Sequence, residues 1–583
     1  MIINKFNCSQ MKSVFCALFL TFLLVAPVHS VSVFDTIEEY LEAGFDQISH
    51  DFGGIHLIRE VEEGLSEAVV YWPENGYLSE ANHFLDVYSI LRDSHSNPDK
   101  YKNVDLLTCA PGAKSDYLKW VPSLVGSAKL GEITTFSSPC FGANTVTLRQ
   151  VSENSVVLEH NVSNYSSWSC ADTFFYANTQ NYHLTSLFFS GTHRTTFSGL
   201  TDYQMKEIKR SGIKLFRVCD SLINIFPDIF KTVLLFFGGF STNPNIPFFG
   251  SHTPFWMVDA NIEFIKHATG YEWKKRANST RFDLDPKYIK SGDFIAATRF
   301  HGMPQLIQYG SGSHAGHSIA ALWIDDELYF VESQGGWYWP QQGIQRTPYK
   351  QWLEWADNAD VSVTILPLKP EIREKFNATA AYEWFKTVEG LPYGYHNFLF
   401  GWIDTANDSF PPVVHPEFLP PMLAIVESIS PAKSSVFNEA INKRLGTENL
   451  TIPQMAEVIE ERGLTFSEVY AIPEQDDWVY SDGKSLVCSS FVVAFWKAGG
   501  LFGDMEIQAT EFTPRDAYSL TFIDPNPELP PECKYNDPDA QFCQVMGQLK
   551  LEFPQLSTVD PYPHMNERCP SRADNNYFRP AGC

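Results

Sequence analysis

The sequence predicts an α+β fold in which an antiparallel sheet packs against an apolar helix. Three observations support it. Residues 310–334 have the pattern of a strand, a tight acidic turn and a second strand. In residues 488–500, large apolar side chains recur at helical spacing and two glycines follow them. Between residues 109 and 199, short β-prone runs alternate with turn residues, which indicates further strands.

The predicted hairpin has a definite register. If Asp325 and Asp326 form a two-residue loop, Ile324 pairs with Glu327, and His317 lies opposite Gln334 further along. Because side chains two apart share a face, His317, Glu332 and Gln334 then point the same way. His317 and Glu332 become diagonal neighbours within hydrogen-bond reach. An imidazole held by a carboxylate is a general base that serves a nucleophile.

Cys488 is the candidate nucleophile because it falls in or just before the first turn of the predicted helix. The helix dipole and the free N–H groups of a first turn favour a thiolate. A nearby imidazolium lowers the pKa of such a thiol further. The helix is then expected to pack across the face that carries His317 and Glu332. The competing interpretation is an inert cysteine buried in the helix.

Four motifs together resemble the permuted papain-like enzymes, namely the NlpC-related group of the YiiX and YaeF type. The motifs are Ser-Gly-Asp-Phe-Ile at residues 291–295, His-Ser-Ile-Ala at 317–320, Val-Glu-Ser at 331–333, and the cysteine that opens the helix. Papain-like enzymes have the order cysteine then histidine, whereas the permuted group has histidine, acid, cysteine, as here. The resemblance covers residues 284–524 and implies a circularly permuted papain-like catalytic domain.

The resemblance implies a triad of Cys488, His317 and Glu332, with Gln334 as the orienting group if the register slips. The segment Gly-Leu-Pro-Tyr at residues 390–393 resembles one that borders the active site in this group, so Tyr393 is expected to line the site. The alternative is an ordinary turn tyrosine. Trp337 lies in an aromatic loop after the hairpin and is either a substrate-site residue or a packing residue.

The N-terminus indicates secretion. Lys5 and Lys12 precede an apolar run at residues 14–25, and small Ser30 follows, as in a signal peptide cleaved after that residue. The run is too short to span a membrane. A net charge of −26 argues against nucleic acid or an anionic membrane as the main partner. The chain is therefore expected in the secreted or lumenal space of the secretory or endolysosomal pathway, without a stable membrane span.

Sequons and cysteines fit that compartment. Six Asn-X-Ser/Thr triplets are glycosylation candidates: Asn161, Asn164, Asn278, Asn377, Asn407 and Asn449. Nine of the 11 cysteines follow the signal, and an odd number leaves one unpaired, which we assign to Cys488. The eight others are disulfide candidates: Cys109, Cys140, Cys170, Cys219, Cys533, Cys543, Cys569 and Cys583. Their pairing is open among about 105 arrangements, and local pairing is the simplest.

The chain is expected to divide into four parts. A signal peptide (1–30) precedes an N-terminal region of unknown role (31–280), with helices expected at 34–45, 57–72 and 78–91. The catalytic domain (281–524) carries an insertion at about 398–478 that forms a lid or one wall of the cleft. A cysteine-rich tail (525–583) follows.

No metal and no cofactor are expected. His301, His314 and His317 have no cysteine or acidic partner at compact ligand spacing, so a metal site is disfavoured. His301 and His314 are expected at the surface or behind the site.

The predicted function is a secreted cysteine-dependent hydrolase of amide or peptide bonds that forms a thioester acyl-enzyme. One alternative keeps the triad but makes the protein an acyltransferase or thioesterase that acts on lipid esters. The other is a non-catalytic glycoprotein that uses the cleft for binding. The substrate is a small-molecule, peptide or lipid acyl compound, and the oligomeric state stays open.

Overall fold

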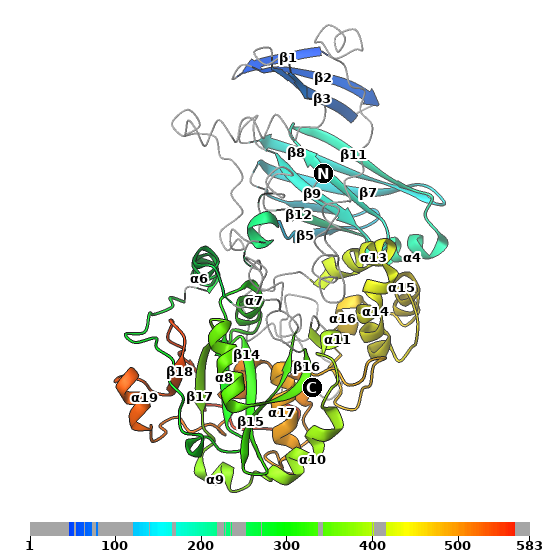
Figure 1. Cartoon of the computed structure of the whole chain (residues 1–583). Helices are drawn as coiled ribbons and strands as arrows, with labels where there is room; N and C mark the ends of the chain where they lie inside the picture. Colours follow the sequence, from blue (N-terminus) through cyan, green and yellow to red (C-terminus); the bar gives the residue numbers. More distant parts are fainter. Residues whose placement is uncertain are drawn as a thin grey trace. The chain divides into compact units, whose positions relative to one another are not determined.

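The computed structural model describes residues 120–565, except for 139, 166–170, 219–226, 228, 234, 236–251, 270, 336–341, 399, 401–415 and 471, together with four short strands before residue 80 (Figure 1). The described residues form two compact units. The N-terminal unit draws on Cys16–Phe230 and Glu417–Ser430, and the C-terminal unit on Lys231–Pro416 and Pro431–Cys583.

The N-terminal unit is built mainly of antiparallel sheets. One has the order β10-β9-β12-β5 and another the order β11-β8-β7-β6, and side chains from both meet in one apolar core that includes Leu148, Leu158, Phe174 and Leu215. A third sheet has the order β1-β2-β3-β4. The elements are β1 (Asp46–Asp51), β2 (Gly54–Glu62), β3 (Leu65–Trp72), β4 (Tyr77–Ser79), β5 (Ser123–Ala128), β6 (Ile133–Phe136), β7 (Phe141–Ser152), β8 (Ser155–Tyr165), β9 (Asp172–Ala177), β10 (Tyr182–Leu187), β11 (Gly191–Ser198), α4 (Asp202–Ser211), β12 (Ile213–Val218) and α13 (Leu419–Ile429).

The strands expected between residues 109 and 199 are confirmed as β7, β8, β10 and β11. The helix expected at 57–72 is wrong, because residues 57–62 belong to β2 and residues 65–72 belong to β3. Val69, Val70 and Tyr71 are strong strand formers. Residues 34–45 and most of 78–91 lie outside the described residues.

The C-terminal unit contains a six-stranded antiparallel sheet in the order β16-β15-β14-β13-β17-β18. Within it, Ile324 pairs with Glu327, which confirms the predicted hairpin register. Asp325 and Asp326 have φ of 47° and 63°, and two positive φ angles are what a type I′ hairpin turn requires. The strands are β13 (Phe294–Thr298), β14 (His317–Ile324), β15 (Glu327–Gln334), β16 (Gly343–Pro348), β17 (Ser362–Leu366) and β18 (Cys543–Met546).

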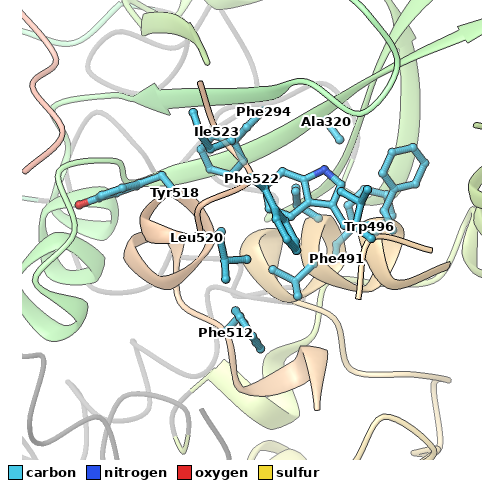
Figure 2. Packing of buried hydrophobic residues seen from close by; sticks show 14 of the residues in the cluster. Phe294, Ala320, Phe491, Trp496, Phe512, Tyr518, Leu520, Phe522 and Ile523 are labelled. Carbon is cyan, nitrogen blue, oxygen red and sulfur yellow. The ribbon is translucent and has the colours of Figure 1, made fainter. Parts of the chain in front are cut away.

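Helices cover both faces of this sheet. On one face, Ala320 and Phe294 pack against Phe491 and Trp496 of α17 (Cys488–Ala498), as Figure 2 shows. The other face packs on α8 (Tyr349–Asn358). His317 shares that second face with Ile319 and Ala321, since alternate side chains point the same way. The expectation that α17 packs across the face of His317 is therefore wrong.

The remaining helices of the C-terminal unit lie before, within and after the sheet strands along the chain. One of them begins at Ala378, because Asn377 caps it by accepting a hydrogen bond from the Ala380 N–H. The helices are α6 (Phe255–Thr269), α7 (Gly302–Ser311), α9 (Pro370–Arg373), α10 (Ala378–Val388), α11 (Tyr395–Phe398), α14 (Pro431–Leu445), α15 (Ile452–Glu461), α16 (Phe466–Tyr470), α18 (Pro514–Ser519) and α19 (Pro531–Asn536). Within the described part of the chain, none of the helices has the length and apolar character needed to span a bilayer.

Candidate active site

His317 and Glu332 form a short, buried pair on neighbouring strands. His317 Nε2 lies 2.6 Å from Glu332 Oε2, and both side chains are less than a tenth exposed. The other carboxylate oxygen, Oε1, accepts a hydrogen bond of 2.8 Å from Trp352 Nε1 of α8. Glu332 is therefore held from two sides. Sequence reasoning did not identify Trp352, because no local pattern marks a tryptophan as the partner of a distant carboxylate.

Cys488 is the first residue of α17, where it was expected, and it is a free, buried thiol. Interactions with the His317 ring and with the backbone N–H groups of Ser318 and Ser489 favour its thiolate form. Since Glu332 occupies Nε2 of His317, Nδ1 is the ring nitrogen left for the sulfur.

The end of strand β14 explains how Cys488 and His317 meet although α17 and α8 cover opposite faces. His317 is the first residue of the strand, so its ring is accessible around the strand end. The preceding residue is Gly316, where a Cβ atom would lie 2.3 Å from Pro304 Cβ. Only glycine therefore allows α7 to approach the strand this closely.

The pKa values of Cys488 and His317 shift in opposite directions. Burial by itself disfavours the charged form of His317, but hydrogen bonds and charges from Cys488 and Glu332 outweigh it and raise the pKa to about 10. Burial also disfavours the thiolate, yet the His317 imidazolium and the two N–H donors lower the pKa of Cys488. The pair is thus expected as a thiolate and an imidazolium.

Tyr393 lies beside Cys488, as the resemblance implied. The Tyr393 hydroxyl interacts with the thiol and the backbone of Cys488. Burial and the neighbouring Cys488 charge raise the pKa of Tyr393. Gly394 permits this contact, because a Cβ atom there would lie 2.4 Å from the Leu486 nitrogen. With glycine at this position, the Gly394 N–H donates a hydrogen bond of 3.1 Å to the Leu486 carbonyl.

A small cleft opens beside the thiol. Its lining includes Tyr393, Asn397, Cys488, Thr510, Glu511 and Phe512. Sequence reasoning missed Asn397, Thr510 and Glu511.

The two other substrate-site candidates have different outcomes. Gln334 is buried, and its side-chain amide donates to the Gly335 carbonyl at 3.1 Å rather than orienting His317. Trp337 lies outside the described residues.

His301 and His314 were expected at the surface or behind the site. Across the described ranges, no group of three His, Cys, Asp or Glu side chains is arranged to hold a metal ion. His301 is fully buried, which excludes the surface position and leaves the other one open; burial and the Arg299 charge lower its pKa. The His314 ring lies 4.0 Å from that of Tyr271, and burial lowers its pKa to about 4.

The disulfide and glycosylation candidates are partly described. Cys533 and Cys543 form a disulfide, as local pairing predicts, and Cys140 is also disulfide-bonded. Outside the described residues lie Cys109, Cys170, Cys219, Cys569, Cys583 and Asn407. Four sequon asparagines are exposed, namely Asn161, Asn164, Asn377 and Asn449, while Asn278 is half-buried. Their glycosylation stays a prediction.

Comparisons with known proteins add one structure. No protein-family model and no curated protein matches the sequence. A crystal structure described as the metalloprotein yiiX from Escherichia coli O157:H7 is similar at 15% identity, over 28% of this chain and 86% of that chain. Its TM-score is 0.15, a level at which the similarity supports no statement about this chain.

Proposed function

We propose that this protein is a cysteine-dependent hydrolase of amide or peptide bonds with a permuted papain-like catalytic domain. One observation carries the proposal: Glu332 is hydrogen-bonded to His317, the His317 ring interacts with the buried Cys488 thiol, and Cys488 lines a cleft. A low-pKa thiolate, an imidazolium and an orienting carboxylate are the groups that acyl transfer needs.

The first half-reaction forms a thioester. The Cys488 thiolate attacks the substrate carbonyl carbon, and the carbonyl electron pair moves to oxygen. When the tetrahedral intermediate collapses, the carbon–nitrogen bond breaks and His317 donates its proton to the leaving amine. Glu332 keeps the imidazole oriented and stabilises its positive charge, and Trp352 keeps Glu332 in place.

Two donors near the sulfur suit the developing oxyanion. One is the backbone N–H of Cys488, at the start of α17, where the helix dipole also favours negative charge. The other is the Tyr393 hydroxyl, which interacts with the thiol and the backbone of Cys488. When the substrate carbonyl oxygen enters this position, the Tyr393 hydroxyl gives up its contacts with Cys488 and donates a hydrogen bond to that oxygen.

The second half-reaction uses water. Neutral His317 takes a proton from water, the hydroxide attacks the thioester carbon, and the carbon–sulfur bond breaks to regenerate the thiolate. The product is a carboxylic acid, and His317 regains the protonated form with which the cycle began. An amine or lipid alcohol in place of water would make the same intermediate a transferase.

The decisive experiment combines labelling with turnover. Iodoacetamide at pH 6 should alkylate Cys488 in the folded protein, because its thiolate persists below the ordinary thiol range. The protein should also hydrolyse members of a library of peptide, N-acyl amino acid and lipid ester substrates. Cys488→Ala should abolish both activities without unfolding the chain, and His317→Ala should be nearly as damaging.

His314→Ala is the matched control, because this histidine lies near the start of the same strand and is not part of the proposed triad. An unreactive Cys488 in the folded protein would favour a glycoprotein that only binds. A reactive Cys488 with lipid esters as the sole substrates would favour the lipid-directed alternative.

A further inference from the structure

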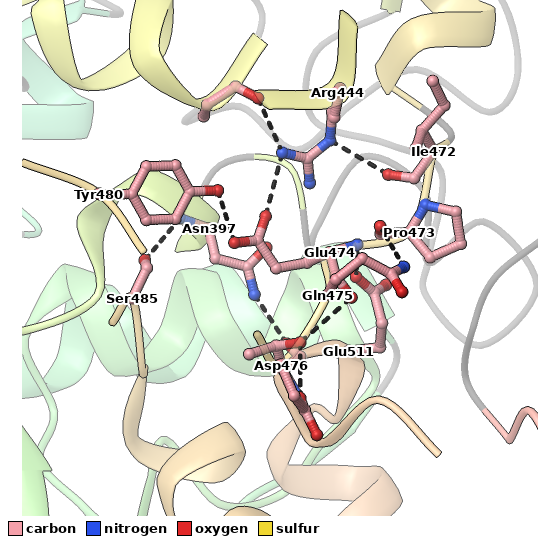
Figure 3. A network of polar contacts seen from close by, with 12 residues as sticks. Asn397, Arg444, Ile472, Pro473, Glu474, Gln475, Asp476, Tyr480, Ser485 and Glu511 are labelled. Atoms are coloured by element: carbon pink, nitrogen blue, oxygen red, sulfur yellow. Dashed lines mark hydrogen bonds and ion pairs between the residues drawn. The ribbon is translucent and has the colours of Figure 1, made fainter. Parts of the chain in front are cut away.

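Asn397 is a buried polar residue in the wall of the cleft, and the proposed mechanism does not use it. It belongs to α11, four residues after Tyr393, and only 2% of it is exposed. Its backbone N–H donates to Ser485 Oγ at 3.0 Å, and its side-chain Nδ2 donates to the Thr510 carbonyl at 2.7 Å. Figure 3 shows the contact with Ser485.

These contacts determine which atom of the Asn397 side-chain amide has no hydrogen-bond partner. The Thr510 carbonyl can only accept, so the amide nitrogen must face it, and Oδ1, in the same amide plane, points away from that carbonyl. Among the described residues, Oδ1 has no hydrogen-bond partner. Buried polar atoms normally find a partner, so an acceptor left unpaired beside a thiol cleft needs an explanation.

The surrounding wall is held by several polar contacts, which favours a binding role. Asp476 Oδ1 accepts hydrogen bonds from the N–H and the hydroxyl of Thr510, at 3.0 and 3.1 Å. Asp476 Oδ2 lies 2.7 Å from Lys497 Nζ of α17. The neighbouring Glu474 forms a buried ion pair of 3.0 Å with Arg444, shown in Figure 3. A preorganised acceptor costs little further ordering when a ligand binds.

The residues that line the cleft also favour one kind of ligand. The described residues that line it include Glu511 and the amide of Asn397 but no lysine, arginine or histidine. Apolar side chains such as Ile307 and Phe512 supply much of the rest. This lining suits a ligand that combines a small apolar part with a hydrogen-bond donor.

We propose that Asn397 Oδ1 accepts a hydrogen bond from an N–H in the acyl part of the substrate, which makes peptidyl or N-acylaminoacyl groups the preferred acyl donors. The scissile nitrogen is a poorer candidate because it must face His317 to be protonated. A fatty acyl chain would bury Oδ1 without a partner. The inference rests on the proposed hydrolase function and defines its substrate class.

The test compares three thioesters with one leaving thiol: N-acetylalanyl, its N-methyl analogue, and the O-acetyllactyl analogue in which oxygen replaces N–H. Loss of a buried hydrogen bond predicts that the wild type prefers the N–H substrate by roughly 10- to 100-fold in kcat/KM. This comparison needs no variant. Equal hydrolysis of all three thioesters would overturn the inference but leave the proposed function standing.

Asn397→Leu supplies the second arm. It should reduce the preference for N–H over oxygen to within about threefold, since no acceptor remains to discriminate. Ser485→Ala is the matched control, because it removes the partner of the Asn397 backbone and keeps Oδ1; its preference should stay that of the wild type. A merely structural Asn397 would slow all three thioesters by one factor, and that result would refute the specificity role.

If the protein is not a hydrolase at all, the same experiments give a different result. In that case the wild type hydrolyses none of the thioesters and iodoacetamide does not label Cys488, and the inference falls with it. If Cys488 is labelled but no thioester turns over, N-acetylalanyl and O-acetyllactyl chloromethyl ketones report the same preference through their labelling rates. Equal labelling rates would refute the inference, and a 10-fold or greater preference for the N–H reagent would support it.

Discussion

Glu332 contacts two aromatic side chains at once, the imidazole of His317 and the indole of Trp352. Because the indole N–H holds one carboxylate oxygen, the carboxylate cannot rotate away. The other carboxylate oxygen is directed at the imidazole. Trp352 is fully buried between α8 and the sheet, so the carboxylate cannot obtain a replacement donor from water.

We predict that Trp352→Phe keeps most of the packing but leaves Glu332 Oε1 unpaired. An unsatisfied buried oxygen costs roughly 1–3 kcal/mol, so the free energy of unfolding should fall by that amount and kcat by about 10-fold or more. Denaturant unfolding and steady-state kinetics measure both. Trp355→Phe on the same helix is the control and should retain nearly full kcat; equal losses in the two variants would remove Trp352 from the site.

The opposed pKa shifts of Cys488 and His317 predict the pH dependence. Activity should rise with pH as the thiol deprotonates below its ordinary value, and fall again as His317 loses its proton at about 10. Because Glu332 raises the pKa of His317, Glu332→Gln should move the alkaline limb of kcat/KM to lower pH and reduce kcat only partly. The exposed Glu327→Gln on the same strand should leave the profile unchanged. An alkaline limb that Glu332→Gln does not move would argue against the pair.

At the scale of elements, the site depends on two close approaches between chain segments. Gly316 lets β14 begin next to α7, and Gly394 lets the Tyr393 segment lie against residues 485–486. These contacts bring a helix, a strand end and a loop to one sulfur.

We predict that Gly394→Ala displaces Tyr393, because the new Cβ would overlap the Leu486 nitrogen. Activity should fall far more than stability at a site with so little space, and thermal unfolding and kcat measure the two effects. Gly390→Ala is the matched control: its φ of 88° strains alanine by about 1 kcal/mol, but nothing lies within 4 Å of the new atom. Similar activities in the two variants would contradict a positioning role for Gly394.

At the scale of the whole molecule, the sheet of the C-terminal unit is completed from far along the chain. Strand β18 pairs with β17 at one edge, and the Cys533–Cys543 disulfide links β18 to α19. Residues after 524 thus contribute Phe542, Leu551 and Phe553 to the main core and build little core of their own.

For the full chain we predict one free thiol. Alkylation of the denatured, unreduced protein should modify Cys488 alone and leave the eight other cysteines of the mature chain blocked, which peptide mass spectrometry can read. The same sample should begin near Val31 and lose mass when treated with a glycosidase, as expected for a secreted glycoprotein. An intact Met1 with unmodified sequons would end the secreted interpretation, and a disulfide at Cys488 would end the nucleophile hypothesis.

By itself, the sequence determined the local features of this protein. The hairpin register, the strands around residues 145–197 and the helix that begins at Cys488 depend on side-chain period and turn chemistry within short segments. Residues 57–72 were mistaken for a helix because a short run of apolar residues fits both the helical and the strand period until strand propensity is considered.

Only the tertiary structure decided which distant side chains meet. Helix α17 covers the sheet face opposite to His317, and the sulfur reaches the imidazole around the end of β14. Trp352 and Asn397 emerged only there, since a tryptophan on an amphipathic helix and an asparagine after a turn carry no local mark of their partners. Their roles depend on approaches between segments as much as 113 positions apart, such as Asn397 and Thr510, which no periodicity encodes.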